Sequence, residues 1–405
     1  MSWKTVTLGD ISSNIQTGPF GSQLHQSDYS EEGTPVVMPK DLVNGHISEV
    51  SIARVSEDHV NRLSRHKIEV GDILYSRRGD VGRCAFATEA EQGWLCGTGC
   101  LRVTTDRSKA IPKFVFYQLQ KAETVGWVEK HAVGATMLNL NTSILSSVPI
   151  EMPSLAEQEV IVGVLSAYDD LIENNQKQIK LLEEAAQRLY KAWFVDLRFP
   201  GHETTPITDG IPEGWVQCRL GEVIVFNPKI VLSKSRVKQC VPMAALSTTS
   251  MVLNSDEFTT TLSNSGSKFQ NGDTLLARIT PCLENGKTAF VTGIESAEGA
   301  VGSTEYIVMR SNGLCPHMVY LLARTEEFRQ EAINSMTGSD GRQRAQVDKL
   351  KVLPYLKPTA DIIALFENLV APLFAQIHTK NRQNAELRQA RDCLLPKLMN
   401  GEIEV

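Results

Sequence analysis

The chain has 405 residues, 42% hydrophobic and 22% charged, which indicates a globular protein of more than one domain rather than a disordered chain. No run approaches the ~18 apolar residues that a membrane span needs, and Met1–Thr5 lacks the apolar core of a signal peptide, so we expect a cytoplasmic protein. A net charge of −6 weakens a nucleic-acid-binding interpretation without excluding it, because one basic face is enough to bind phosphates.

The second half of the chain repeats the pattern of the first half. Each half begins with a tryptophan before a Leu-Gly-acid motif, continues with a Gly-Asp turn that enters an apolar, strand-like run, and ends with two prolines at a fixed spacing. The paired segments are Trp3 to Leu8-Gly9-Asp10 and Trp215 to Leu220-Gly221-Glu222, Val70–Leu74 and Asn271–Leu276, and Leu145–Pro149 with Pro153 and Leu350–Pro354 with Pro358. This repeat predicts two copies of one domain.

In the first half, Pro112–Lys121 reads as a short helix, and a long helix follows the second proline. Ser154 and Glu157 have the spacing of a capping box, so we expect this long helix to begin near Leu155. Its apolar positions alternate in steps of four and three, with Asn175 as one polar exception, which predicts a coiled-coil seam. The seam residues are Ile161, Leu165, Tyr168, Ile172, Ile179, Leu182, Ala186, Leu189 and Trp193. We place the charges of Glu183, Glu184, Arg188 and Lys191 on the solvated outer face of the helix.

The second half ends in a helix of the same register with more polar insertions. Thr359–Ile362 stands where an acidic capping box is expected, so the helix start is less clearly marked. Pro372 removes one intrahelical hydrogen bond and predicts a bend. The seam residues are Phe366, Val370, Leu373, Ile377, Leu387, Leu394 and Leu398.

These elements predict an α+β fold with an internal pseudo-two-fold repeat. Two α/β domains, residues 1–152 and 214–357, are each followed by a spacer helix, residues 153–198 and 358–401. A connector of residues 199–213, rich in Pro and Gly, is expected to be exposed. Each helix needs a partner seam, so we expect the two to pair antiparallel. A seam of ~33 residues at ~1.5 Å each would separate the domains by about 50 Å, compared with ~34–36 Å per turn of B-DNA.

Several segments resemble the specificity subunits of type I restriction-modification systems, and the resemblance extends along essentially the whole chain. Together, in order and in duplicate, they are specific for that family. They are Gly18-Pro19-Phe20-Gly21-Ser22, Gly71–Gly79 with Gly82-Arg83, Leu189–Phe194, Ile211–Trp215 and Leu394–Ile403.

The resemblance implies two target-recognition domains that read an asymmetric, split DNA site with an unspecified spacer. It also implies a non-catalytic chain that binds double-stranded DNA, two methyltransferase subunits and, in the full complex, restriction-translocase subunits. S-adenosylmethionine, ATP and Mg²⁺ are then expected on the partner subunits, with no cofactor on this chain. Ala277–Pro281 departs from Ser76–Gly79, so the second domain should read a different half-site.

Base reading requires arginine, lysine or amide side chains on loops that can enter a groove. Each of these side chains also has a plain alternative as a solvated turn residue or a phosphate contact. The candidates are Gln16, Ser22, Gln23, Arg77, Arg78 and Arg83 in the first half, and Lys229, Arg278, Lys287, Arg342 and Arg344 in the second.

The sequence also bears on three other possibilities: a metal site, a self-contained enzyme and a protein scaffold. The eight cysteines are scattered, and the closest pair, Cys96 and Cys100, has no second pair at zinc-ligand spacing, so we predict reduced, mostly buried thiols and no metal. The alternative enzyme is a self-contained methyltransferase or nuclease that carries its own recognition domains. Amino-methyltransferases share an Asn/Asp-Pro-Pro-aromatic motif and a glycine-rich cofactor loop; the motif is not found in convincing form, and Gly97-Thr98-Gly99 is too short to supply the loop. A scaffold that spaces two protein-binding modules remains compatible with the repeat.

Overall fold

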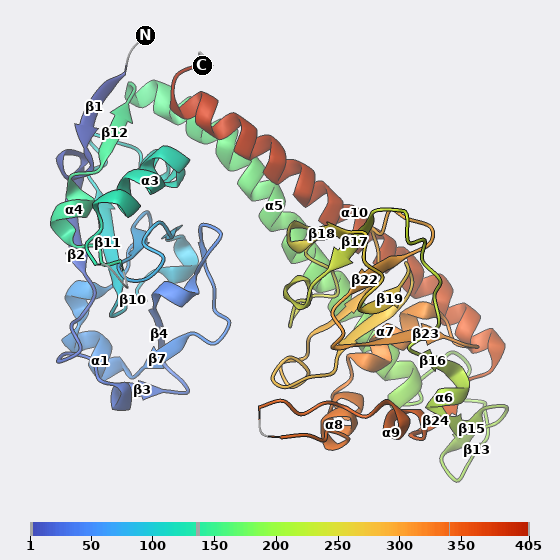
Figure 1. Ribbon diagram of the computed structural model, residues 1–405. Coiled ribbons are helices and arrows are strands. Elements are labelled where there is room, and N and C mark those ends of the chain that lie inside the picture. The colour runs from blue at the N-terminus through green and yellow to red at the C-terminus, as the bar shows by residue number, and fades with distance from the viewer. Residues whose placement is uncertain (1–2, 135–137, 340, 404–405) are drawn as a thin grey trace. The chain divides into compact units, whose positions relative to one another are not determined.

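The computed structural model describes residues 3–134, 138–339 and 341–403 and divides the chain into two compact units (Figure 1). Unit 1 comprises Met1–Leu171 and Leu387–Val405, and unit 2 comprises Ile172–Glu386. Two long helices, α5 (Leu155–Tyr190) and α10 (Ala360–Met399), contribute residues to both units. Each unit therefore contains one globular part and a segment of each long helix.

The globular part of unit 1 is a mixed α/β domain. Its elements are β1 (Lys4–Thr7), β2 (Ser12–Thr17), β3 (Tyr29–Ser30), β4 (Thr34–Val37), β5 (Leu42–Val43), β6 (His46–Ile47), β7 (Ala53–Val55), α1 (Glu57–Arg62), β8 (Ile73–Ser76), β9 (Cys84–Phe86), β10 (Leu95–Cys96), β11 (Cys100–Thr105), α2 (Pro112–Gln120), α3 (Ala122–His131), α4 (Thr142–Ser146) and β12 (Pro149–Met152). One sheet has the order β2-β11-β8-β9 and another β10-β4-β7-β3, while β1 pairs with β12. The predicted helix at Pro112 is confirmed as α2.

The globular part of unit 2 has the same plan. Its elements are β13 (Ile207–Thr208), β14 (Ile211–Pro212), β15 (Val216–Arg219), α6 (Leu220–Val223), β16 (Ile224–Phe226), β17 (Lys238–Val241), β18 (Thr259–Thr261), β19 (Ser267–Phe269), β20 (Thr274–Ala277), β21 (Thr288–Phe290), β22 (Ala300–Gly302), β23 (Tyr306–Ser311), α7 (Pro316–Ala323), α8 (Glu326–Asn334), α9 (Val347–Lys351) and β24 (Pro354–Lys357). Its sheets have the orders β16-β23-β20-β21 and β18-β17-β22-β19, while β15 pairs with β24.

The repeated motifs make the same hydrogen bonds in both units. The Leu8 N–H donates to a carbonyl at the end of its domain at 2.9 Å, and the Leu220 N–H does so at 3.0 Å. The Asp72 carboxylate accepts from the Glu69 N–H at 2.8 Å, and Asp273 forms the matching bond in unit 2 at 2.8 Å. These aspartates satisfy backbone groups at the turn before the strand. The duplicated sequence pattern is therefore a duplicated fold.

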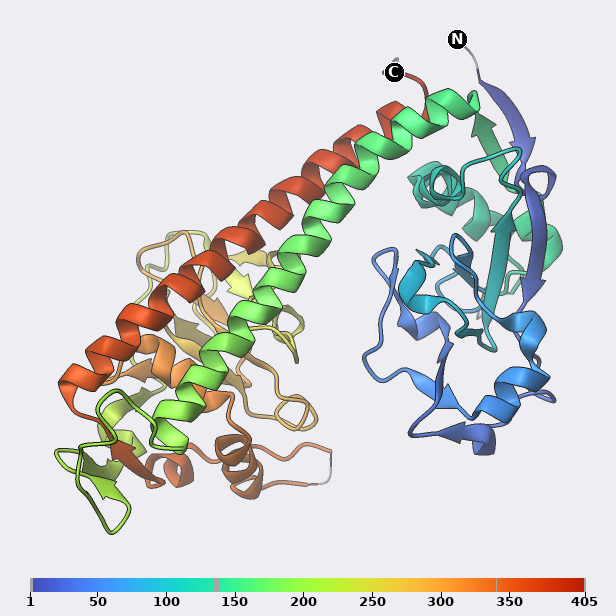
Figure 2. The same ribbon diagram turned by 180° about the vertical axis from the view of Figure 1, so that it is seen from behind.

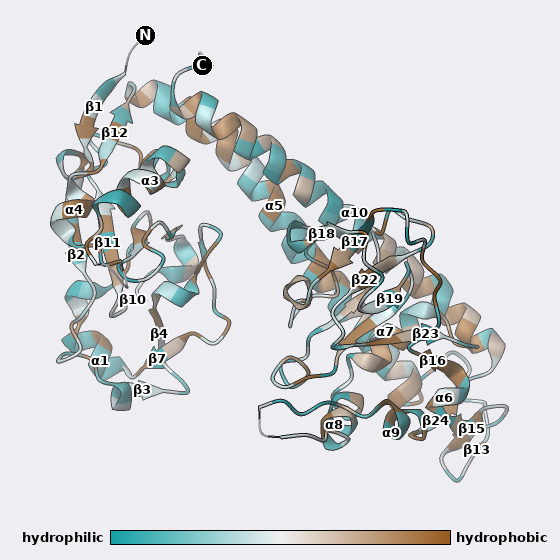
Figure 3. Ribbon diagram, viewed as in Figure 1, coloured by the Kyte–Doolittle hydropathy of each residue, from teal (hydrophilic) through white to brown (hydrophobic). Residues whose placement is uncertain are grey.

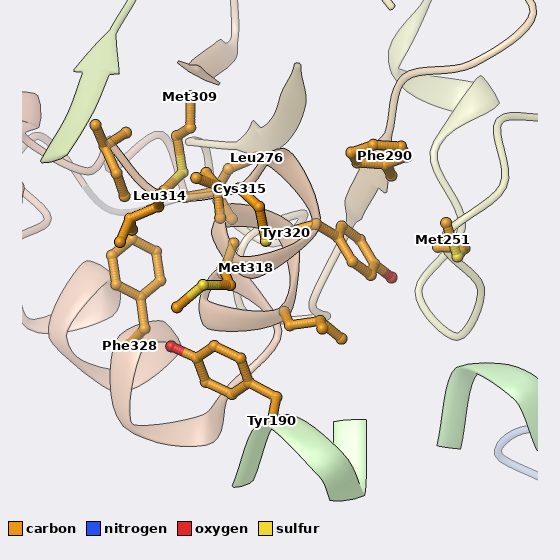
Figure 4. Close-up of a cluster of buried hydrophobic side chains, with 14 of the residues drawn as sticks. Tyr190, Met251, Leu276, Phe290, Met309, Leu314, Cys315, Met318, Tyr320 and Phe328 are labelled. Atoms are coloured by element: carbon orange, nitrogen blue, oxygen red, sulfur yellow. The ribbon is translucent and has the colours of Figure 1, made fainter. Parts of the chain in front are cut away.

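Helix α7 and the end of α5 supply much of the core of unit 2. Figure 4 shows Met318 and Tyr320 of α7 with Phe328 of α8 and Tyr190 of α5, and all four are at most 4% exposed. Full burial of side chains of this size contributes roughly 1.5–3 kcal/mol each. Figure 3 shows that hydrophobic and hydrophilic residues alternate along both α5 and α10.

Helices α5 and α10 lie side by side and antiparallel (Figures 1 and 2). In unit 1, the Asp169 carboxylate accepts from the Arg391 guanidinium at 2.7 Å. In unit 2, Asn175 donates to Asn384 at 3.0 Å, and the rings of Tyr190 and Phe366 lie 6.1 Å apart. Residues later in α5 contact residues earlier in α10, which confirms the antiparallel pairing.

None of the predicted seam positions is exposed. The half-buried ones are Tyr168, Leu182, Leu189, Leu373, Leu387 and Leu394. The buried ones are Ile161, Leu165, Ile172, Ile179, Ala186, Trp193, Phe366, Val370, Ile377 and Leu398.

Helix α5 begins where its capping box predicts. The Ser154 N–H donates to the Glu157 carboxylate at 2.9 Å, and the Glu157 N–H donates to the Ser154 hydroxyl at 3.3 Å. After Tyr190 the chain forms a π-helical turn, Lys191–Val195. Helix α10 runs unbroken through Pro372, so the lost hydrogen bond does not end it.

Two expectations about exposure are wrong. Glu183 is buried rather than on the outer face, because its carboxylate accepts from the Met251 N–H at 2.7 Å and the Ser250 hydroxyl at 2.9 Å. The connector is not wholly exposed either. It forms the short hairpin β13–β14, and Phe199 is buried with its ring 4.9 Å from that of Trp215.

Helix α10 is also long and apolar enough to cross a membrane by length and composition. An 18-residue window in it has a mean hydropathy of 1.5, and 22% of that window is buried. A helix whose apolar side packs on a protein core passes the same test, and Phe366, Val370 and Ile377 are fully buried in the core of unit 2. The helix is therefore weak evidence for a membrane span.

Candidate functional site

The segment after β8 in unit 1 carries Arg77 and Arg78, and backbone hydrogen bonds hold it from both sides. The Arg77 N–H donates to the Gly99 carbonyl at 2.8 Å, and the Leu140 N–H donates to the Arg77 carbonyl at 2.8 Å. Arg78 forms an isolated antiparallel bridge with Asn139. Both arginine side chains therefore start from a backbone whose position is fixed.

Arg77 lies against the exposed ring of Phe20. The guanidinium carbon is 5.9 Å from the ring centroid, and 55% of Phe20 is exposed. The Arg77 Nε is buried and has no hydrogen-bond partner among the described residues. A guanidinium beside an aromatic ring is held in orientation while its charge remains available.

Arg78 and Arg83 differ in how their charge is compensated. Arg78 is exposed, and its guanidinium forms no hydrogen bond or ion pair within the part of the chain that the structure describes. Arg83 donates twice to Asp80, at 3.0 and 2.7 Å, and the two side chains are 43% and 57% exposed. An exposed pair of this kind is weak, about 0–1 kcal/mol, so a phosphate could replace Asp80 at little cost.

The predicted amide candidates serve internal contacts. Gln16 Nε2 donates to the Arg65 carbonyl at 2.6 Å, and Gln23 Oε1 accepts from the Phe20 N–H at 3.1 Å. Ser22 is exposed in the same turn. Gln23 therefore shapes the loop around Phe20, whereas Gln16 binds the segment that carries Arg65, and a base contact by either side chain would require it to exchange partners.

In unit 2, the matching segment after β20 has the same backbone frame. The Arg278 N–H donates to the Glu305 carbonyl at 3.0 Å, and the Ala345 N–H donates to the Arg278 carbonyl at 2.8 Å. An isolated bridge joins Ile279 to Arg344, as Arg78 is joined to Asn139 in unit 1. Arg278 and Arg344 therefore occupy positions that correspond to Arg77 and Asn139.

The carboxylate of Glu305 compensates both arginines in unit 2. Arg344 donates to it from Nε at 2.9 Å and from Nη2 at 2.8 Å, and Arg278 Nε donates at 3.2 Å. The hydrogen bonds from Arg344 and the charge of Arg278 lower the pKa of Glu305. Glu305 stands directly before β23, where unit 1 has Gly99 directly before β11. Among the residues that the structure describes, Arg77 and Arg78 thus contact no carboxylate, whereas Glu305 binds both Arg278 and Arg344.

The remaining candidates of unit 2 differ in availability. Lys287 Nζ donates to the Met243 carbonyl at 3.0 Å. Lys229 and Arg342 are exposed, and their side chains form no hydrogen bond or ion pair with any residue that the structure describes. The loop that carries Arg342 needs its glycines, because Gly338 and Gly341 have φ angles of 133° and 76°.

Sequence reasoning missed Glu305 and the pairing of Phe20 with Arg77. A residue-by-residue alignment of the two halves through β11 and β23 would have placed Glu305 opposite Gly99. No local signal marks the Phe20–Arg77 contact, because it joins segments that are distant in the sequence.

Comparisons with known proteins agree with the recognition made from the motifs. Residues 1–184 match the type I restriction modification DNA specificity domain. The chain is 27% identical over 400 residues to the type I restriction enzyme MjaIX specificity subunit of Methanocaldococcus jannaschii, an alignment that covers 92% of this chain and 87% of that one. It is 24% identical to the HindI specificity subunit of Haemophilus influenzae, with 99% of each chain covered.

A solved structure shares the fold. The crystal structure of a type I restriction-modification S subunit from M. genitalium matches with a TM-score of 0.57 at 16% identity, covering 98% of this chain and 96% of that chain. The predicted fold class, two α/β domains with two long antiparallel helices, is confirmed.

Proposed function

We infer from these similarities that the chain is a member of the type I specificity-subunit family, and we propose that it reads a bipartite DNA site with one half-site for each globular part. The observation that carries this proposal is the duplicated arginine segment. Arg77 and Arg278 stand in the same backbone frame in two copies of one fold, and each has a second arginine nearby, Arg78 in unit 1 and Arg344 in unit 2. Two copies of a reader in one chain suit a target with two half-sites.

The difference between the copies supports an asymmetric target. In unit 1, Arg78 is free to approach a phosphate or the O6 and N7 of a guanine. In unit 2, Glu305 holds the fork of Arg344 in one orientation, and its own charge disfavours a nearby phosphate. We propose that unit 2 depends more on oriented contacts to base edges, and unit 1 more on direct cationic contacts.

We propose that this chain is non-catalytic and works with partners in the cytoplasm. These partners are two methyltransferase subunits that use S-adenosylmethionine and, in the complete enzyme, restriction-translocase subunits that use ATP and Mg²⁺. The support is the family relationship, which concerns specificity subunits rather than catalytic ones.

The proposal is tested with the chain in complex with its methyltransferase subunits. Retention of duplex DNA should fall linearly with the logarithm of salt concentration, because phosphate contacts release counterions. Sequencing of methylated adenines in genomic DNA from a host that carries the complex should return one split, asymmetric motif. Absence of salt-dependent DNA binding would favour a scaffold, and DNA methylation by the chain alone would favour a self-contained enzyme.

Arg78→Ala sharpens this test. If Arg78 contacts a guanine, the variant should lose about 1–3 kcal/mol of discrimination at one base of one half-site, with the other half-site unchanged. Arg198→Ala is the matched control, because Arg198 is 67% exposed and lies outside the arginine segments. Equal loss on unrelated sequences would instead assign Arg78 to a phosphate.

A further inference from the structure

Three metal-ligating side chains from α7 and α10 meet in unit 2. Cys315 is the residue before the first turn of α7, His317 lies in that turn, and Glu367 lies on α10. The cysteine sulfur, an imidazole nitrogen and a carboxylate oxygen all lie within 4.8 Å of one another. None of these residues belongs to the arginine segments.

The surrounding residues hold these groups in place. His317 Nδ1 lies 2.9 Å from the Glu367 carboxylate. Its ring stacks on Phe290 with centroids 5.0 Å apart and meets the ring of Phe374 at 4.4 Å. Cys315 is 6% exposed and lies among the buried side chains beside Met318 (Figure 4). Packing therefore fixes the imidazole and the thiol before any ion binds, which lowers the entropic cost of binding.

We propose that Cys315, His317 and Glu367 form a binding site for a transition-metal ion of the Zn²⁺ class. A thiolate, an imidazole and a carboxylate together make a donor set that Zn²⁺ accepts, whereas Ca²⁺ and Mg²⁺ require oxygen ligands. The thiolate and the carboxylate carry two negative charges, which balance the ion. Binding displaces the thiol proton to solvent, so the site is neutral when loaded.

The spacing fits such an ion after a small movement. Bonds of about 2.0–2.3 Å at a tetrahedral centre put neighbouring ligand atoms about 3.6 Å apart. The His317–Glu367 distance of 2.9 Å is shorter than this, and the largest separation in the cluster is at most 4.8 Å. Glu367 is the most exposed of the three side chains, and rotation of its carboxylate can adjust both distances.

A pocket supplies room for a fourth ligand. Its volume is about 470 Å³, and Cys315, Glu367 and Lys357 are among the residues that line it. Three protein ligands with one open position is a common zinc arrangement, with solvent as the fourth ligand. Because Cys315 and Glu367 come from different helices, the ion would bind α7 to α10 and stabilise unit 2.

The site is tested by adding Co²⁺ to the full-length chain after chelator treatment. A thiolate-to-cobalt charge-transfer absorption and tetrahedral d–d bands should grow to about one Co²⁺ per chain, and Zn²⁺ should displace them. Zn²⁺ should also raise the Tm of the treated chain, because an ion that binds only the folded state stabilises it.

Matched variants separate this site from adventitious binding. Cys315→Ser should abolish the charge-transfer absorption, and Glu367→Gln should weaken Co²⁺ binding by at least about tenfold. Cys393→Ser and Glu386→Gln should leave binding unchanged, since Cys393 is an exposed free thiol and Glu386 an exposed carboxylate on the same helix, α10. Circular dichroism of each variant confirms that it folds.

The proposal is overturned if the treated wild-type chain shows no charge-transfer absorption, or if Cys315→Ser keeps it. If Cys315→Ser fails to fold, Glu367→Gln still tests the site, because unchanged Co²⁺ affinity in that variant would overturn the proposal. The measurement involves no DNA and no partner subunit, so its outcome is independent of the proposed DNA recognition.

Discussion

The buried Asn175–Asn384 pair is the polar exception in the helix seam, and it offers a quantitative test of how α5 and α10 pair in unit 2. Asn175 donates to Asn384 at 3.0 Å, and Asn384 donates to the Ile172 carbonyl at 3.4 Å. The two residues are 9% and 2% exposed. Asn175→Leu therefore leaves the Asn384 Oδ1 buried without its donor.

A stranded buried amide costs about 1–3 kcal/mol, and the new leucine gains at most about 1.5–3 kcal/mol, less where it faces a polar group. We expect each single leucine variant to destabilise the pairing by about 1 kcal/mol. In the double variant, Asn175→Leu with Asn384→Leu, neither amide remains, and we expect stability equal to wild type or about 1–3 kcal/mol greater. The two substitutions should therefore be strongly non-additive.

Hydrogen exchange followed by mass spectrometry measures this locally, because peptides from α5 and α10 report the opening of this segment even if the two units unfold separately. Asn174→Leu is the control, since Asn174 is the neighbouring exposed asparagine on α5 and should change stability by no more than about 0.5 kcal/mol. Neutral single variants with an additive double variant would refute the reasoning, because the amides would then contribute nothing to the seam.

Further predictions concern two glutamates: Glu305, which binds two arginines, and Glu183, which is buried. Glu305→Gln removes the charge between Arg278 and Arg344, so binding of unrelated DNA should strengthen and its log–log salt slope should steepen by about 1. An unchanged slope in a salt titration would contradict this. Glu183→Ala should cost about 1–3 kcal/mol in urea unfolding, because the Met251 N–H loses its acceptor, whereas Glu183→Gln keeps an acceptor and should cost less. Burial raises the pKa of Glu183 above its usual value of 4.5. The contribution of the protonated carboxyl group to the free energy of unfolding is therefore fully present below pH 4.5 and is lost as the pH rises through the raised pKa. As the pH rises through this range, the wild-type protein should lose stability relative to Glu183→Gln. Parallel curves of unfolding free energy against pH for the two proteins would contradict the raised pKa of Glu183.

Features encoded by neighbouring residues could be predicted from the sequence. The Ser154–Glu157 capping box fixes the start of α5, and the Gly-Asp turns before β8 and β20 form because Asp72 and Asp273 accept from backbone groups three residues earlier. The apolar period of the long helices required a partner seam, and the repeat supplied it.

The roles of single charged residues could not be predicted in the same way. Glu183 follows the polar face of a helical pattern, yet unit 2 folds over it and supplies two donors. Lys287 and Gln16 looked available and instead bind backbone carbonyls, while the contact of every candidate with DNA stays a prediction.

The sequence by itself determined the repeat, the helix seam and the resemblance to the type I specificity subunits, because these rest on periodicity and on short motifs. Only the tertiary structure decided that Glu305 compensates Arg278 and Arg344 and that Cys315, His317 and Glu367 converge. Such partners lie up to about 50 residues apart on different elements, and their meeting depends on how strands and helices pack rather than on any local preference.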